Sequence, residues 1–213
     1  MPEENRFQDA GPADVIGDPE FASVAGLPPV WGPVIGAVVR IATPATTGSG
    51  FFIASDRVIT NHHVVPAKEP LLRGGVRCGF HGGSLGVEVV VDPDTCFRTS
   101  PELDYTVFAV HPVPGVVPLF LDNAGTPEVG EEVSVIGHRR GAPLEYSSAD
   151  GAVQSVEPPH VEYRADTETG MSGGPVLLVK TRRLVALHHF GDEDHDDSNR
   201  GVLATAIKED LAR

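Results

Sequence analysis

Short runs of β-branched and aromatic residues, each bounded by Gly, Pro, Asn or Asp, recur along most of this chain. Such runs are typical of β-strands joined by tight turns. The first group comprises AVVRI (37–41), GFFIAS (50–55), RVIT (57–60), VRCGF (76–80) and VEVVV (87–91). After LDYTVFAV (103–110), the second group comprises VPLFL (117–121), EVSVIG (132–137), EYSSADGAVQSV (145–156), VEYRAD (161–166), PVLLVK (175–180), LVALHHF (184–190) and VLATAI (202–207). The pattern predicts an all-β chain with two groups of about six strands.

Helical patterns are nearly absent, and only KEDLAR (208–213) favours a short C-terminal helix. Antiparallel sheets avoid free edges by stacking or by closing, so a sandwich and a pair of barrels are both compatible with the spacing. Periodicity alone does not choose between them.

Composition narrows the functional classes. The chain has 213 residues, enough to bury a core without disulfides, and a net charge of −14 without a basic face, so nucleic-acid binding is not expected. The longest apolar stretch, 32–42, contains Pro and Arg and is shorter than the roughly 17–25 residues of a spanning helix, so no membrane association is expected. Cys78 and Cys96 are the only cysteines, and we expect free thiols in a reducing compartment, with a bond between them as the alternative.

Residues 1–34 are rich in Pro, Gly and acidic residues and follow neither hydrophobic period. We expect an extended lead that regulates access to the rest of the chain or links it to a fused or associated regulatory protein. The first residues, MPEENRFQDAGPADV, lack the basic and apolar regions of a secretory signal. A cytoplasmic location is expected, with a mature secreted form as the alternative.

The segment GMSGGP (170–175) places a serine among glycines, between two predicted strands. Glycines permit a tight turn that exposes Ser172 Oγ and leaves the amides of Gly170 and Ser172 free to converge on one point. The segment is therefore a candidate nucleophile with an oxyanion hole. An ordinary glycine-rich hairpin is the alternative.

A nucleophilic serine needs a base, and the base needs an orienting acceptor. FFIASDRVITNHHV (51–64) reads as two strands around a turn and ends in His62 and His63. LDYTVFAV (103–110) places Asp104 at the start of an otherwise apolar strand, where a carboxylate is costly unless a donor satisfies it. A histidine N–H would satisfy it.

These segments resemble the motifs of the chymotrypsin-like serine peptidases, particularly the bacterial branch of glutamyl endopeptidases and high-temperature-requirement proteases. TNHHV (60–64) resembles the family's Thr-Ala-Ala-His-Cys, LDYTV (103–107) its Asp-Ile-Ala-Leu, and GMSGGP its Gly-Asp-Ser-Gly-Gly-Pro. The order His, Asp, Ser is also the family's. The resemblance covers roughly residues 37–207, and three motifs in this order on an all-strand chain are strong evidence.

The resemblance implies two six-stranded antiparallel Greek-key β-barrels within a peptidase domain at 35–213, the first at about 35–112 and the second at about 113–207. The active site would lie in the cleft between them. Ser172 would attack the scissile carbonyl, His63 would act as base, Asp104 would orient His63, and the amides of Gly170 and Ser172 would bind the oxyanion. The substrate would be a protein or peptide lying along an edge of the second barrel. No cofactor or metal is implied.

His62 competes with His63 for the role of base, because neighbours in an extended segment point to opposite faces. The family motif favours His63. Met171 stands where the animal digestive enzymes carry an Asp that pairs with the new N-terminus, so that ion pair is not expected here. Val64 replaces a disulfide cysteine that the bacterial branch also lacks.

The specificity pocket has two interpretations. Thr167 and His188 match positions where glutamyl endopeptidases place Thr and His around the substrate carboxylate, and both can hydrogen-bond an acid. Asp166 stands where trypsin holds its Asp for basic residues, and the acidic run 192–197 follows nearby. We favour an acidic P1 residue, with Arg or Lys as the alternative, and a preference for Ala or Leu stays open.

Two other functions are compatible with the pattern. A catalytically silent binding module would keep the fold without the activity, although the intact set of His, Asp and Ser argues against it. A metal-dependent hydrolase would use the histidines and carboxylates near residue 190, but they lack a recognised ligand spacing and a solvated loop is preferred for 192–197. We therefore predict a serine endopeptidase, active above about pH 6.5–7 where His63 is neutral.

Overall fold

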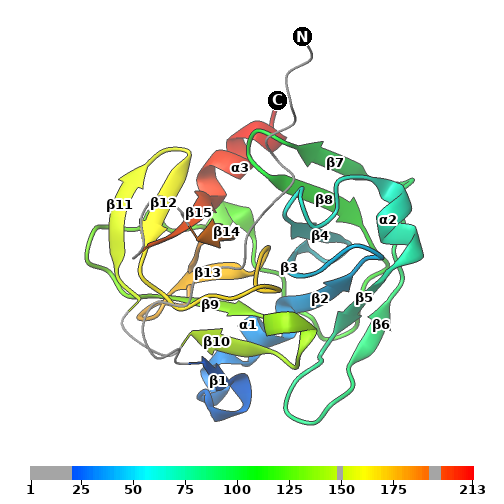
Figure 1. Ribbon diagram of the computed structural model, residues 1–213, viewed down its shortest axis with the longest axis horizontal. Coiled ribbons are helices and arrows are strands. Elements are labelled where there is room, and N and C mark those ends of the chain that lie inside the picture. The colour runs from blue at the N-terminus through cyan, green and yellow to red at the C-terminus, as the bar shows by residue number, and fades with distance from the viewer. Residues whose placement is uncertain (1–20, 148–150, 192–197) are drawn as a thin grey trace.

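The computed structural model describes residues 21–147, 151–191 and 198–213, and its strands form two antiparallel sheets that lie side by side (Figure 1). The first sheet contains β2 (Val38–Ala42), β3 (Thr47–Ala54), β4 (Arg57–Thr60), β5 (Gly75–Cys78), β6 (Val87–Val89), β7 (Phe97–Ser100) and β8 (Tyr105–Ala109). The second contains β1 (Phe21–Ser23), β9 (Val133–Gly137), β10 (Glu145–Ser147), β11 (Val153–Glu157), β12 (His160–Tyr163), β13 (Pro175–Leu178), β14 (Leu184–Gly191) and β15 (Asn199–Leu203). The predicted all-β class is confirmed.

The expected pair of closed six-stranded barrels needs correction. Hydrogen-bonded strands follow the order β6-β5-β2-β3-β4-β8-β7 in a seven-stranded sheet and β1-β10-β9-β13-β14-β15-β12-β11 in an eight-stranded one. Neither sheet closes through a strand ladder. Isolated bridges, Val91 with Val110 and Glu132 with Ala152, join the ends of β6 and β8 and the starts of β9 and β11. A single residue pair at each seam leaves both sheets open in their strand pairing, and β7, β10 and β1 extend beyond the bridged strands.

The central strands β3 and β4 of the first sheet bury residues on both faces. Phe52 packs into the core of the first sheet, whereas its neighbour Phe51 packs into a cluster shared by the two sheets. Val58 and Ile59 on β4 divide in the same way, because successive side chains of a strand point to opposite faces. The shared cluster also holds Ile136 and Leu177 of the second sheet, while a third cluster fills the interior of that sheet. The two halves are therefore packed against each other along a common apolar surface.

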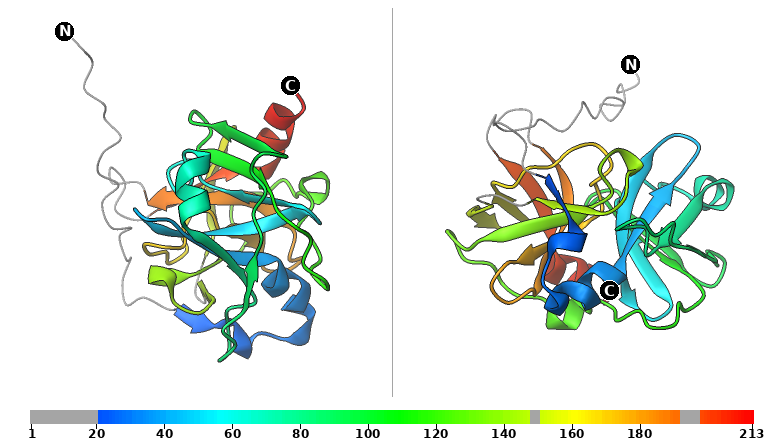
Figure 2. Two further views of the ribbon diagram at one scale, coloured as in Figure 1. Left: turned by 90° about the vertical axis from the view of Figure 1, so that its right-hand side faces the viewer. Right: turned by 90° about the horizontal axis from the view of Figure 1, so that it is seen from below.

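The segment before β2, expected to be an extended lead, is folded where the structure describes it. Residues 21–34 contain β1, the short turns η1 (Val24–Gly26) and η2 (Pro29–Trp31) and the start of helix α1 (Gly32–Ala37). Val24, Trp31 and Val34 are buried in the cluster that the two sheets share. Figure 2 shows this segment lying across one end of the molecule, where the sheets meet. Residues 1–20 lie outside the described residues.

The remaining helices differ in part from expectation. The predicted C-terminal helix is confirmed as α3 (Ala204–Leu211), but it begins where the sequence indicated a strand through residue 207. Tyr105 Oη donates to Asp210 Oδ2 at 2.6 Å and ties α3 to β8. Helix α2 (Lys68–Arg73) and the turns η3 (Leu121–Asn123) and η4 (Arg139–Gly141) were not expected, and 117–120 forms no strand. Within the described residues, no helix combines the length and the apolar character that crossing a bilayer requires.

Candidate active site

His63 and Asp104 meet because two paired strands end at the same place. Strand β4 pairs antiparallel with β8, with Thr60 opposite Thr106, so the turn after β4 lies beside the residue before β8. His63 Nδ1 is 2.7 Å from Asp104 Oδ2, and the backbone N–H of His63 donates to Asp104 Oδ1 at 2.9 Å. His62 instead contacts Thr99, with its Nδ1 2.7 Å from the hydroxyl. The geometry therefore associates His63, and not His62, with the carboxylate.

Asp104 is held by its backbone as well. Its φ of 42° lies in the left-handed region, which a non-glycine residue adopts only when its surroundings impose it. Asn61 supplies one such constraint, since its Nδ2 donates to the Asp104 carbonyl at 2.9 Å. The carboxylate is 10% exposed and thus faces His63 in a fixed orientation.

A second histidine, which the sequence analysis missed as a partner of Asp104, contacts the same carboxylate. His189 Nε2 lies 3.0 Å from Asp104 Oδ2, and the rings of His189 and His63 stack with their centroids 6.0 Å apart. The residue falls at a register shift of β14, where His188 pairs with Gly201 and Phe190 with Arg200. A bulge redirects the side chain of the extra residue. Burial opposes ionisation of Asp104, but the hydrogen bonds from His189 and His63 outweigh it and hold the pKa of this carboxyl well below its usual range.

Ser172 lies in a loop that is held against β3 and β14. The N–H of Ser49 on β3 donates to the Ser172 carbonyl at 2.8 Å. The N–H of the next residue, Gly173, donates to the backbone carbonyl of His188 at 2.9 Å. A Cβ at position 173 would lie 2.2 Å from the Ser49 carbonyl and 3.2 Å from the Asn61 nitrogen, so only glycine fits. The loop is thus held between the start of the His63 turn and the histidines of β14. Within the described residues the Ser172 hydroxyl makes no hydrogen bond, and such bonds often form only once substrate is bound.

The two candidate oxyanion amides are unpaired within the described part of the chain, where no backbone carbonyl accepts from the N–H of Gly170 or Ser172. The carbonyl that precedes each is occupied: Thr169 accepts from Arg140 N–H at 2.6 Å and Met171 from Gly174 N–H at 2.9 Å. Because N–H and C=O point in opposite directions across a trans peptide, these bonds turn both N–H groups outward. Gly170 adopts a φ of 96°, and a Cβ there would lie 2.5 Å from the His138 carbonyl. Both amides can therefore bind a negatively charged oxygen.

Thr167 and His188, the predicted pocket residues, each make a buried side-chain hydrogen bond, and the two bonds lie on paired strands. Thr167 Oγ1 donates to Asn199 Oδ1 at 2.6 Å, and His188 Nδ1 lies 2.6 Å from Tyr163 Oη. Tyr163 of β12 pairs directly with Asn199 of β15, which brings the two interactions together. Burial, with smaller contributions from His189 and His63, lowers the pKa of His188 to about 3, so this ring is neutral at physiological pH. Asp166 is half-buried beside Thr167.

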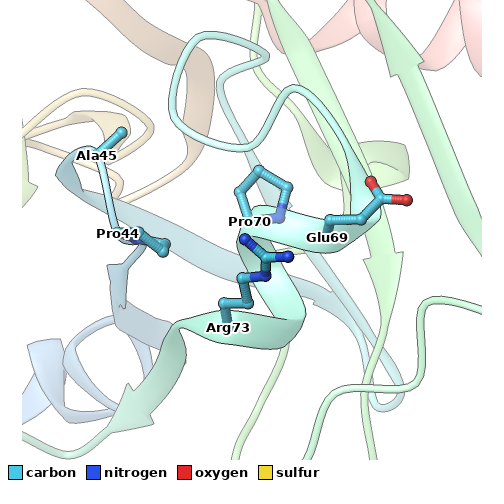
Figure 3. Close-up of a pocket in the computed structure, with 5 residues that line it drawn as sticks. All are labelled: Pro44, Ala45, Glu69, Pro70 and Arg73. Atoms are coloured by element: carbon cyan, nitrogen blue, oxygen red, sulfur yellow. The ribbon is translucent and has the colours of Figure 1, made fainter.

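One other feature of the described residues lies apart from these contacts. A hollow of about 210 Å³ between α2 and the loop after β2 is lined by Pro44, Ala45, Glu69, Pro70 and Arg73, none of them a predicted site residue (Figure 3). The acidic run 192–197, considered above as a solvated loop or a metal cluster, lies outside the described residues. Cys78 and Cys96 are both free thiols.

The sequence profile of the trypsin-like peptidase domain matches residues 48–187, which contain all three motifs. The chain belongs to the trypsin-like peptidase family. The expected resemblance to chymotrypsin-like serine peptidases is confirmed, while the glutamyl-endopeptidase branch stays a prediction.

Solved proteases share this fold, and a curated protein is similar to the chain in sequence. The trypsin-like peptidase superimposes on the active form of the Rv3671c protease from M. tuberculosis with a TM-score of 0.68 and 23% identity, covering 98% of this chain and 92% of that one. A serine endoprotease from Yersinia pestis gives a TM-score of 0.66 at 16% identity, covering 87% of this chain and 66% of that one. The uncharacterized protein y4fB of Sinorhizobium fredii is 29% identical over 187 residues. That match takes in 74% of this chain but only 28% of y4fB, so the chain spans a minor part of this relative.

Proposed function

We propose that this trypsin-like peptidase is a serine endopeptidase that cleaves peptide bonds through an acyl-enzyme on Ser172. The main support is the pair of hydrogen bonds between His63 and Asp104, which leaves Nε2 of His63 as the free nitrogen of the ring, together with a loop that carries a serine and two unpaired amides. A base with an oriented imidazole, a nucleophile and two oxyanion donors are the groups that acyl transfer requires.

In the proposed reaction, His63 Nε2 takes the proton of Ser172 as Oγ attacks the scissile carbonyl. The amides of Gly170 and Ser172 bind the oxyanion, and His63 returns the proton to the leaving amine as the C–N bond breaks. Water, activated by the same nitrogen, then hydrolyses the ester and regenerates Ser172. Asp104 keeps Nδ1 protonated throughout and stabilises the imidazolium that forms at each step.

For the specificity pocket we propose an acidic P1 residue. The 2.6 Å contact of Tyr163 Oη with His188 Nδ1 is much shorter than the 3.4 Å from Oη to the Arg200 carbonyl, which favours a hydroxyl that donates to Nδ1. Burial raises the pKa of Tyr163 well above its usual value, so this proton is retained. A neutral ring that accepts at Nδ1 carries its own proton at Nε2, and an N–H there is a donor suited to a substrate carboxylate.

The alternative pocket takes Arg or Lys through Asp166. A half-buried carboxylate before Thr167 supports it. Cleavage rates of two peptides that differ only in having Glu or Lys at P1 distinguish the two proposed pockets. Asp166→Asn abolishes cleavage after Lys only if Asp166 binds the basic side chain.

Labelling by a fluorophosphonate probe tests the proposed activity. We expect one phosphonyl group per chain, attached to Ser172, and loss of labelling and of peptide cleavage in Ser172→Ala. A folded wild-type protein that neither reacts nor cleaves any member of a peptide library is instead a catalytically silent binding module. Cleavage that survives Ser172→Ala but stops with a chelator identifies a metal-dependent hydrolase.

A further inference from the structure

The turn that carries the oxyanion amides begins with a buried acidic residue that has two basic partners. Glu168 is 7% exposed at its side chain, and its carboxylate contacts Arg139 Nη1 at 3.0 Å and Nη2 of Arg140. Arg139 also donates through Nε to Glu145 on β10 at 2.6 Å. Arg139 therefore joins the turn before Ser172 to the strand β10, through a guanidinium shared by two carboxylates.

This contact lies next to the peptides that orient the oxyanion amides. The backbone N–H of Arg140 holds the Thr169 carbonyl, and the Glu168 carbonyl accepts from Met171 N–H at 3.0 Å. Ser49 Oγ completes the arrangement, because it donates to the Gly170 carbonyl at 2.7 Å and accepts from His138 N–H at 2.8 Å. Movement of Glu168 away from Arg139 would release the Thr169 carbonyl and allow the Gly170 N–H to turn out of the oxyanion hole.

The other face of Arg139 rests on the N-terminal segment. Its guanidinium carbon lies 4.7 Å from the centroid of the Phe21 ring, a cation–π distance. Strand β1 pairs antiparallel with β10, placing Phe21 opposite Ser147 and Ser23 opposite Glu145. Phe21 also packs against the core of the second sheet. A continuous set of contacts thus runs from β1 through Arg139 to Glu168, two residues before Gly170.

We propose that Arg139 is a positioning residue for the oxyanion hole, and that β1 supports it. The ion pair with Glu168 keeps the Gly170 N–H directed at the developing oxyanion, and the packing of Phe21 on Arg139 makes the competence of the hole depend on the segment that precedes β2. Met171, beside Ser172, carries no charge and cannot form an ion pair of its own, so this support comes from Arg139 and Glu168. This inference rests on the proposed peptidase function.

Steady-state kinetics on one chromogenic peptide test the inference. We expect Arg139→Gln to lower kcat about 10- to 100-fold, less than the complete loss of one oxyanion donor, with KM changed less than about twofold, because the hole binds charge that appears only in the transition state. Arg139→Lys keeps the positive charge but cannot bind two carboxylates at once as a guanidinium does, so its kcat should lie between those of wild type and Arg139→Gln. Phe21→Ala should lower kcat about threefold, and Phe21→Tyr, which keeps the ring, should stay near wild type. Arg57→Gln is the matched control, since the Arg57 side chain is 28% exposed against 31% for Arg139 and its ion pair with Asp56 lies on the first sheet.

Deuterium uptake supplies a readout that does not require activity. The peptide covering 138–142 contains the amide of Arg140, and the peptide covering 167–174 contains the amide of Met171. Both amides should exchange faster in Arg139→Gln than in wild type, while the peptide covering 51–60 should exchange at the wild-type rate. Unchanged uptake in these two segments, an unchanged kcat, or an effect confined to KM overturns the inference. If wild type neither labels nor cleaves, the proposed function fails, and the uptake experiment still decides whether Arg139 holds the turn.

Discussion

His189 Nε2 lies 3.0 Å from Asp104 Oδ2, the same oxygen that lies 2.7 Å from His63 Nδ1. The carboxylate therefore receives donors from two rings at one oxygen and from the His63 backbone at the other. A carboxylate that accepts several hydrogen bonds is fixed in orientation and stays ionised, which is what the orienting partner of a base requires. His189 is thus part of the environment that sets the position of His63.

Replacement of His189 tests this role. Hydrogen bonds to charged groups contribute about 1.5–3 kcal/mol, so His189→Ala should lower kcat/KM about 10-fold or more. His189→Gln keeps an N–H donor and should recover part of the loss. Initial rates on one peptide across pH 5–9 measure both variants. If His189→Ala keeps wild-type rates over the whole range, the contact does not position Asp104.

The approach of Gly173 to β3 gives a prediction with a matched control. At φ of 85°, a Cβ would lie 2.2 Å from the Ser49 carbonyl, whereas Gly115 has a φ of 83° with open space around its Cβ position. Gly115→Ala bears only the conformational cost of about 1–2 kcal/mol. Gly173→Ala adds a clash with backbone and should lose about 3 kcal/mol or more, together with activity.

Urea unfolding of the two variants at pH 7.5 gives the comparison. If both variants lose the same unfolding free energy, the loop around Ser172 can shift to accommodate the added Cβ. The close contact with β3 would then not be what fixes the position of this loop.

Several parts of this arrangement could be predicted from the sequence. Asp104 stands at the start of an otherwise apolar strand, so its carboxylate needs a hydrogen-bond donor. The doublet of His62 and His63 ends an earlier strand and supplies such a donor. The contact between a histidine and Asp104 therefore follows from the chemistry of these residues and the order of the strands. The Gly-rich segment around Ser172 likewise indicates a tight turn, and the φ values of Gly170 and Gly173 agree with it.

Other parts depend on packing that no local pattern encodes. His189 faces Asp104 because β14 carries a bulge at that residue, which breaks the alternation by which strand neighbours are assigned to faces. Arg139 and Glu168 lie in separate loops that become adjacent only when β9 and β13 pair. Residues 21–34 are rich in Pro and Gly and follow neither hydrophobic period, yet they contribute Trp31 and Val34 to the shared core, because apolar residues in short turns suffice to fill a junction.

Two buried histidines predict acid sensitivity. Burial lowers the pKa of His188 to about 3 and that of His138 to about 4, so both stay neutral in the folded state while an unfolded chain binds protons below about pH 6.5. Stability from these residues is therefore present above pH 6.5 and is lost as the pH falls toward 4, by about 1.4 kcal/mol per pH unit for each ring. We expect the unfolding free energy in urea to drop by about 3–4 kcal/mol between pH 7.5 and 5.0.

The contribution of one ring can be isolated. His188→Gln should remove about half of this pH dependence, and His111→Gln, at an exposed position, serves as the control. A pH dependence that is the same in His188→Gln and in wild type would show that the ring is not buried in its neutral form.

The contact between Tyr163 and His188 yields a prediction about substrate choice. Tyr163→Phe removes the hydroxyl that donates to Nδ1, so the ring of His188 no longer favours the tautomer with a proton on Nε2. We expect kcat/KM for peptides with Glu at P1 to fall about 5- to 10-fold, in line with the loss of about 1 kcal/mol for one hydrogen bond, while peptides with Ala at P1 change less than about twofold. Tyr105→Phe is the matched control, because it removes an equally short hydroxyl contact of 2.6 Å to Asp210, away from the pocket. Equal losses of kcat/KM for the Glu and Ala substrates would mean that the Tyr163 hydroxyl supports the fold of the pocket and does not select the substrate. If a Lys substrate is cleaved faster than either, Asp166 is the residue that selects the substrate.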